Sequence, residues 1–438
     1  MKKTYLRKKL PPIMYAGLWV MVIYCGFFPH AWAHRKHYLQ IDEIVIVGAK
    51  HTRPHIIIQE LTFREGEHIS YEQIQQSRQA ILNLALFNKV ELEIDGKVLR
   101  IHIKEKKYFL ALPEVRHKQE TGISVGGYVN FDNLLGLNQY LKIRYRSIEA
   151  AQSKSGVSQT LSAQYIYPRI GGSLYNLDTN FNIATEPVDL QPTTSPLMTY
   201  NRRDYLVKLL ASKWINKNRV SKGWRVGGGV LTNWRTNSLN ATYQSQVPEG
   251  RISALIIQNT YTDINNLIYS VSGYEYNINL ELGAQLLSSD YDYYKITFQY
   301  DLFYPLSKPH QNFNVEFNLA TASRKIFDAY NYSLGGFDGL RGYDNGEVYG
   351  NITHLTRFEY LSPVFNSIKW RSVTFFDIGN AFERSGKLDI FDLRYSVGLG
   401  LRFKINFFVD MEMRLDVAHN LTNDKPQIYA TIRKIREK

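Results

Sequence analysis

The sequence predicts a membrane all-β fold, in which a sixteen-stranded transmembrane β-barrel follows one small α+β domain. Three observations predict it. Apolar and polar residues alternate over long segments throughout the second half of the chain. The chain is 13% aromatic but only 44% hydrophobic. No apolar run long enough for a membrane-spanning helix, about eighteen residues, follows the N-terminal segment. Long alternating strands therefore offer the route across a bilayer.

Residues 1–33 have the features of an export signal peptide. Basic residues crowd the first nine positions, residues 13–28 are largely apolar, and Ala31 and Ala33 are the small residues that a signal peptidase prefers. We expect cleavage after Ala33; an uncleaved anchor is the alternative. Cleavage removes five positive charges and no negative ones, which lowers the net charge from +13 to +8. It also removes Cys25, the one cysteine of the chain, so we expect no disulfide.

Residues 38–108 predict the α+β domain. Residues 41–47 form an alternating strand that Gly48 ends, and Thr52 is placed to cap a helix with Pro54 in its first turn, ending near Leu61. Ser70 and Gln73 fit a capping box for a second helix. The segments "KVELEI" and "VLRIHI" then predict a hairpin around the Asp-Gly pair at residues 95–96.

This β-α-α-β-β order, together with "LFNKVELEI", resembles a POTRA domain, the periplasmic polypeptide-transport module. Another small α+β domain is the alternative. A short sheet with an exposed edge can add a strand from an extended client polypeptide or from a periplasmic partner. The other interpretation is that the domain only plugs or orients the barrel.

Residues 120–438 predict the barrel. In "YYKITFQYDLFY" the apolar side chains of residues 294, 296, 298, 300, 302 and 304 share one face, and Lys295, Thr297, Gln299 and Asp301 share the other. Such strands suit a lipid-facing outside and an aqueous lumen. Fifteen or sixteen segments can be counted, and we choose sixteen because single-chain bacterial barrels have even strand numbers. A soluble β-sandwich or β-repeat array is the alternative.

The glycine-rich segment "GGFDGLRGYDNG", residues 335–346, is similar to the sixth-loop motif of the BamA/TamA/FhaC superfamily of outer-membrane barrels. Its core here is Arg341-Gly342-Tyr343. The segments "RFEYLSP", "FFDIGNAF", "YSVGLGLRF" and "MRLDVAHNL" occur in the order of that superfamily's strand motifs, and "DNLLGLN" resembles its first barrel turn. The resemblance implies a loop, residues 324–350, that folds into the lumen.

The resemblance also implies partners for the arginine. Arg341 would pair with Asp377 and Glu359, while Gly342, Tyr343 and Gly379 complete the clamp motif. The pleat supports this independently, because Asp377 and Glu359 are each flanked by apolar residues and so point to the opposite face. Alternatively, Arg341 is an exposed loop cation and the two acids simply line the lumen.

Gly122, Gly126 and Gly127 weaken strand pairing in what we expect to be the first barrel strand. The resemblance implies that the seam between the first and last strands opens laterally to admit a client strand. "GISVG", residues 122–126, matches the G-x-S-x-G pattern of hydrolases, but alternation continues through it where a helix is required. We therefore expect no enzyme. No metal-ligand spacing, dinucleotide fingerprint or P-loop is present, so we expect no metal and no cofactor.

The sequence thus predicts a bacterial outer-membrane protein, with its POTRA domain in the periplasm, that assembles or translocates client polypeptides. Its moderate basicity suits contact with anionic phospholipid or lipopolysaccharide, with simple solubility as the alternative. No nucleic-acid-binding motif accompanies this charge, so we expect no nucleic-acid partner. A passive pore or structural barrel, and a soluble exported β-rich binding protein, are the alternative functions. The basic final segment "IYATIRKIREK" departs from the aromatic ending of the superfamily.

Overall fold

The computed structural model describes residues 38–118, 122–149, 157–190, 198–216, 222–239, 247–327, 329, 331–383, 392–422 and 426–434. The expected signal peptide, residues 1–33, lies outside these ranges. Among the helices of the described residues, none combines the length and the apolar character needed to cross a membrane.

The N-terminal α+β domain contains a three-stranded sheet in the order β2 (Glu43–Val47), β5 (Val98–Glu105) and β4 (Phe87–Asp95). Strands β2 and β5 run parallel, while β4 and β5 form the expected hairpin. The parallel pair requires a long crossover, which contains α2 (Pro54–Ile58) and α3 (Tyr71–Asn83). The short strands β1 (Tyr38–Gln40) and β3 (His68–Ser70) form a separate two-stranded sheet.

The two helices of this domain begin differently. Helix α3 has the expected capping box, in which Ser70 accepts from the backbone of Gln73 and the Gln73 side chain accepts from the backbone of Ser70. The expected Thr52 cap of α2 is wrong, because Arg53 holds the N-cap position without a side-chain hydrogen bond. The Thr52 hydroxyl instead lies 3.1 Å from the Tyr108 hydroxyl and accepts from Asn133. A tertiary contact has replaced a local one.

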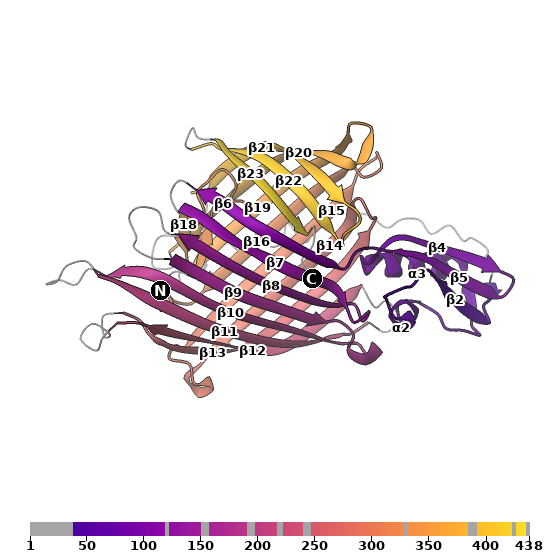
Figure 1. The fold of residues 1–438 in the computed structure, drawn as a ribbon, viewed down its shortest axis with the longest axis horizontal. Helices are drawn as coiled ribbons and strands as arrows, with labels where there is room; N and C mark the ends of the chain where they lie inside the picture. Colours follow the sequence, from indigo (N-terminus) through magenta and orange to yellow (C-terminus); the bar gives the residue numbers. More distant parts are fainter. Residues whose placement is uncertain are drawn as a thin grey trace, which may run out of the picture. The chain divides into compact units, whose positions relative to one another are not determined.

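The remaining chain forms one antiparallel sheet of sixteen strands, which curves into a barrel of tilted strands (Figure 1). The strand number agrees with the prediction. In chain order the strands are β6 (Phe109–Lys118), β7 (Gly122–Leu134), β8 (Gln139–Glu149), β9 (Val157–Tyr167), β10 (Tyr175–Leu190), β11 (Met198–Trp214), β12 (Gly223–Asn237), β13 (Gly250–Asn266), β14 (Val271–Gly283), β15 (Tyr293–Pro305), β16 (Asn312–Ala322), β19 (Ile352–Val364), β20 (Ser367–Phe382), β21 (Arg394–Ile405), β22 (Met411–Asn420) and β23 (Pro426–Lys434).

Short elements occupy some of the connections. Two 3₁₀ turns, η2 (Ile170–Gly172) and η3 (Gln285–Leu287), come after β9 and β14. The hairpin strands β17 (Tyr332–Leu334) and β18 (Val348–Gly350) lie in the connection between β16 and β19.

Alternation along the strands separates a polar inner face from an apolar outer face. On β14, Ile278 and Leu282 are exposed. Glu275 and Glu281 alternate with them and point to the opposite face. There Glu281 accepts from the Tyr293 hydroxyl at 2.6 Å, and Glu275 accepts from the Thr262 hydroxyl at 2.6 Å. The carboxylates thus find partners on one face, while the apolar side chains are exposed on the other.

The sheet begins earlier than the expected boundary at residue 120. Its first strand is β6, and the order of strands runs from β6 to β23 without a hydrogen-bonded pair between these two among the described residues. Pro113 weakens the strand signal of this segment. Proline is tolerated here because β6 is an edge strand, where a missing N–H interrupts no ladder on the open side.

Candidate functional site

The connection between β16 and β19 folds against the polar face of the C-terminal strands. Its β17–β18 hairpin carries a tight loop in which Gly335 and Gly342 have φ values of +118° and +85°, a region that glycine adopts without strain. Leu340 and Tyr343 are fully buried beside Leu355 of the barrel wall. The loop is therefore packed against the barrel wall.

Arg341 is the centre of the contacts made by this loop. Its Nε donates to Asp377 Oδ2 at 2.7 Å and its Nη2 donates to Asp377 Oδ1 at 2.6 Å, a bidentate pair. Its Nη1 donates to Glu359 Oε1 at 2.7 Å and lies 3.5 Å from Asp416 Oδ2. The structure therefore brings Arg341 together with both of the acids expected from the sequence, and with a third, Asp416.

The surroundings of Arg341 exclude water. The side chain is 3% exposed and that of Asp377 is 0% exposed. The guanidinium carbon lies 3.6 Å from the centre of the Phe375 ring, which favours a cation over its face. Burial alone lowers the pKa of Arg341, but the hydrogen bonds to Asp377 and the charges of Glu359, Asp377 and Asp416 outweigh it, so the pKa lies above its ordinary value. The arginine is permanently charged.

Gly342 and Tyr343 fasten the loop on the other side of Arg341. The Gly342 N–H donates to the Tyr429 hydroxyl at 3.0 Å, and its carbonyl accepts from Asn420 Nδ2 at 2.9 Å. The Tyr343 hydroxyl donates to the Tyr395 carbonyl at 3.1 Å. A Cβ atom on Gly342 would lie 2.9 Å from the backbone nitrogen of Asn420, so this approach requires glycine.

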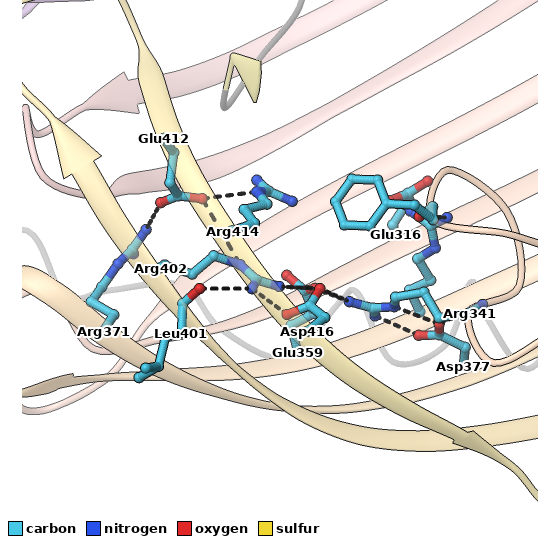
Figure 2. A network of polar contacts seen from close by, with 12 residues as sticks. Glu316, Arg341, Glu359, Arg371, Asp377, Leu401, Arg402, Glu412, Arg414 and Asp416 are labelled. Carbon is cyan, nitrogen blue, oxygen red and sulfur yellow. Dashed lines mark hydrogen bonds and ion pairs between the residues drawn. The ribbon is translucent and has the colours of Figure 1, made fainter. Parts of the chain in front are cut away.

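The ion pairs continue away from the loop along β20, β21 and β22 (Figure 2). Arg402, 1% exposed, donates to both oxygens of Asp416, and its Nη2 donates to Glu359 Oε1 at 3.3 Å. Glu412 then accepts from Arg371 and Arg414, both at 2.9 Å. Four arginines thus face four carboxylates, and their charges balance. We call these eight residues the wall network: Arg341, Arg371, Arg402, Arg414, Glu359, Asp377, Glu412 and Asp416.

Arg357 on β19 holds the loop backbone directly. Its Nε donates to the Gly339 carbonyl at 3.1 Å, its Nη2 donates to the carbonyls of Gly339 and Phe337, and its Nη1 donates to Glu316 at 3.2 Å. The sequence prediction missed Arg357, Arg402 and Asp416. The alternation that indicated Asp377 could have found them, because each is flanked by residues of the outward face.

The other residues singled out from the sequence lie elsewhere. Gly379 is on β20 opposite Leu355, where a Cβ atom would lie 2.4 Å from the His354 carbonyl oxygen. Gly122, Gly126 and Gly127 lie on β7, the second strand of the sheet, and are paired with β6. Gly126 and Gly127 are also paired with β8. They were expected on the first strand, so this is a correction: the edge strand is β6, which carries Pro113.

Comparisons with known proteins agree with this architecture. The Omp85 superfamily domain matches residues 133–432, and a POTRA domain, described as a surface antigen variable number repeat, matches residues 39–106. The search among curated proteins found no match.

Solved structures give the same fold at low sequence identity. CdiB from Escherichia coli has a TM-score of 0.65 at 14% identity, over 90% of this chain and 76% of that one. CdiB from Acinetobacter baumannii has a TM-score of 0.62 at 15% identity, over 90% and 73%. BamA from Haemophilus ducreyi lacking POTRA domains 1–3 has a TM-score of 0.52 at 16% identity, over 90% and 85%.

Proposed function

The chain belongs to the Omp85 superfamily, and from this premise we propose that it is an outer-membrane protein that inserts or translocates polypeptides. The POTRA domain lies in the periplasm and the barrel crosses the membrane. No chemical step is involved: the client is held by backbone hydrogen bonds along a strand edge.

The observation that carries this proposal is the open seam of the sheet. Every other neighbouring pair of strands in the barrel is hydrogen-bonded, but among the described residues β6 and β23 share no ladder. Two strand edges are therefore available in one place. An exposed edge has N–H and C=O groups that an extended polypeptide can satisfy.

The wall network has a supporting role in this proposal. It fastens the β16–β19 connection to the four strands β19 to β22, which lie on the β23 side of the seam. A rigid wall on that side lets the seam open without loss of the barrel. Arg341 acts as an internal clamp and takes no part in chemistry.

A reconstitution experiment tests the function. Full-length protein is placed in liposomes, and a urea-unfolded outer-membrane barrel is added together with a soluble control protein. We expect the barrel client to fold or become protease-protected faster than in empty liposomes. Steady conductance in planar bilayers without any effect on the client would instead identify a passive pore. Recovery of the protein in the soluble periplasmic fraction of cells would contradict the membrane location.

A further inference from the structure

A groove of about 720 Å³ opens on the barrel surface where β9 and β11 begin and β10 ends, and its lining includes Arg203 and Thr185. Both residues lie on the outer face. The next residue on β11, Asp204, points the opposite way and pairs with Arg235, whose guanidinium carbon lies 4.3 Å from the ring centre of Phe327 in the inward-folded connection. Arg203 therefore points away from the lumen.

The groove lies at the end of the barrel that is far from the α+β domain along the strands. Strand β6 follows β5 of that domain almost directly. Successive strands from β6 to β13 are antiparallel, so β11 and β13 both begin at the opposite end. With the α+β domain in the periplasm, this far end is at the cell surface.

The outer face changes in character toward the far end. Leu209, Val230 and Leu255 form one row across β11, β12 and β13, and all three are exposed. Further toward the far end, Tyr205 is paired with Trp234 on the same face. An apolar belt bounded by aromatic side chains is typical of the membrane interface. Arg203 lies beyond these aromatic rings, at the level where lipid headgroups begin.

A second arginine lies beside the same aromatic pair. Arg251 of β13 is paired with Trp234, and its guanidinium carbon lies 5.2 Å from the ring centre. Its Nε donates to the Thr232 hydroxyl at 3.2 Å and to the Ser253 hydroxyl at 2.9 Å. These contacts fix the guanidinium on the outer face, and its two Nη groups have no acceptor within the described residues.

The charges of Arg203 and Arg251 are not neutralised by carboxylates, since neither guanidinium forms an ion pair in the described part of the chain. Acidic residues nearby accept hydrogen bonds from other groups; they are Asp189, Glu249 and Asp290. The connections at this end include one lysine and no acidic residue in the ranges 150–156, 191–197 and 240–246. Two cations therefore remain available to an anionic ligand at the level of the headgroups.

We propose that this surface binds the phosphate groups of lipopolysaccharide in the outer leaflet of the membrane. We call it the rim site, made of Thr185, Arg203, Tyr205, Trp234 and Arg251. A guanidinium can hold a phosphate through two hydrogen bonds, and the groove beside Arg203 offers hydroxyl and amide groups to a sugar. The acyl chains would lie along the apolar rows below.

The spacing of the two arginines favours a glycolipid over a phospholipid. Arg203 and Arg251 lie on either side of β12, and two strand spacings separate them by about 10 Å. A ligand with phosphates on two linked sugars can reach both guanidiniums, whereas a phospholipid brings one phosphate. The inference rests on the membrane location in the proposed function and goes beyond it, because it assigns a lipid to one face of the barrel.

Native mass spectrometry of the full-length protein in detergent tests the rim site. The probes are lipid A with both phosphates, which is the membrane anchor of lipopolysaccharide, the same lipid with its phosphates removed, and phosphatidylglycerol. We expect the phosphorylated lipid A to bind about tenfold more tightly than the dephosphorylated form, in line with hydrogen bonds between charged groups. Phosphatidylglycerol should bind more weakly than phosphorylated lipid A.

Arg203→Gln and Arg251→Gln should each weaken binding of phosphorylated lipid A about fivefold. Lys213→Gln is the matched control, because it removes an exposed cation from the outer face at the other end of β11, where Lys213 lies over the Tyr175 ring. This variant should bind phosphorylated lipid A as the wild-type protein does. All three variants are first checked for the heat-dependent gel shift of a folded barrel.

Equal binding of the two forms of lipid A to the wild-type protein would overturn the phosphate site. An unchanged preference in both arginine variants would overturn the role of these residues. Phosphatidylglycerol binding as tight as that of phosphorylated lipid A would overturn the choice of a glycolipid. The client-folding assay, run in phospholipid liposomes, contains no lipid A, so failure there counts against the proposed function and not against the rim site.

Discussion

Arg341 and Asp377 meet through two parallel hydrogen bonds, of 2.7 Å from Nε and 2.6 Å from Nη2, in a place where neither side chain is more than 3% exposed. A lysine has one ammonium group and cannot reproduce this geometry. The pair therefore depends on an arginine, and its removal leaves a buried carboxylate without its strongest partner.

Arg341→Ala should destabilise the folded barrel by about 3–5 kcal/mol, because breaking a buried pair leaves an uncompensated charge. Arg341→Lys should recover less than half of this loss. Unfolding in urea, followed by the heat-dependent gel shift, measures both. Arg433→Ala is the control, since Arg433 pairs with the largely exposed Asp338 and should cost at most about 1 kcal/mol.

Combining Arg341→Ala with Asp377→Asn should be less destabilising than the sum of the two single changes. The neutral amide no longer leaves a buried negative charge in need of a cation. Additive losses in this double-mutant cycle would show that the two residues stabilise the barrel independently of each other.

Gly342→Ala should be more destabilising than Gly346→Ala. Both glycines have positive φ values, +85° and +75°, so the backbone strain is comparable. Only at Gly342 would the new Cβ atom lie 2.9 Å from backbone, whereas at Gly346 its nearest neighbour is the Ser333 side chain at 3.9 Å. Equal urea midpoints for the two variants would rule out the close approach as the reason for glycine.

The lowered pKa of Lys106 leads us to expect that the stability of the folded protein depends on pH. Burial, reinforced by Lys404 and opposed by Asp410 and Asp132, lowers its pKa from 10.5 to about 8. Between these values the unfolded chain binds more protons than the folded one, so this lysine's cost is fully present below pH 8 and fades as the pH rises. We expect Lys106→Met to have the higher urea midpoint at pH 7 and to lose this advantage by about pH 10.5. If the difference in urea midpoint between Lys106→Met and the wild-type protein stays the same over this pH range, the cost of burying Lys106 does not come from its charge.

Much of this architecture could be predicted from the sequence because strand alternation and side-chain direction are local. Asp377 is flanked by Phe376 and Ile378, and that alone puts it on the inner face opposite the apolar side chains. The capping box of α3 is local in the same way. The number of strands came from the even-number rule for single-chain bacterial barrels.

The missed features depend on tertiary contacts. Strand β6 lies before the expected start of the barrel at residue 120, and Pro113 weakens its strand signal. Its pairing with β7, and its place at the end of the strand order among the described residues, show it to be an edge strand. The seam was consequently placed one strand too far along the chain. Thr52 has the chemistry of a helix cap, but a contact with Asn133, distant in sequence, occupies its hydroxyl.

The central claim is that client strands are received at the seam between β6 and β23, and a photocrosslinking experiment tests it most directly. p-Benzoylphenylalanine replaces Phe109 on β6 in one variant and Phe313 on β16 in the other. Both residues are exposed on the outer face and lie near the same end of the sheet, but β16 is paired on both sides. The two variants are illuminated in the reconstituted liposomes during addition of the unfolded barrel. The account predicts an adduct with the client at position 109 that disappears as the client folds, and none at position 313; equal adducts at both positions, or an adduct only at 313, would contradict it.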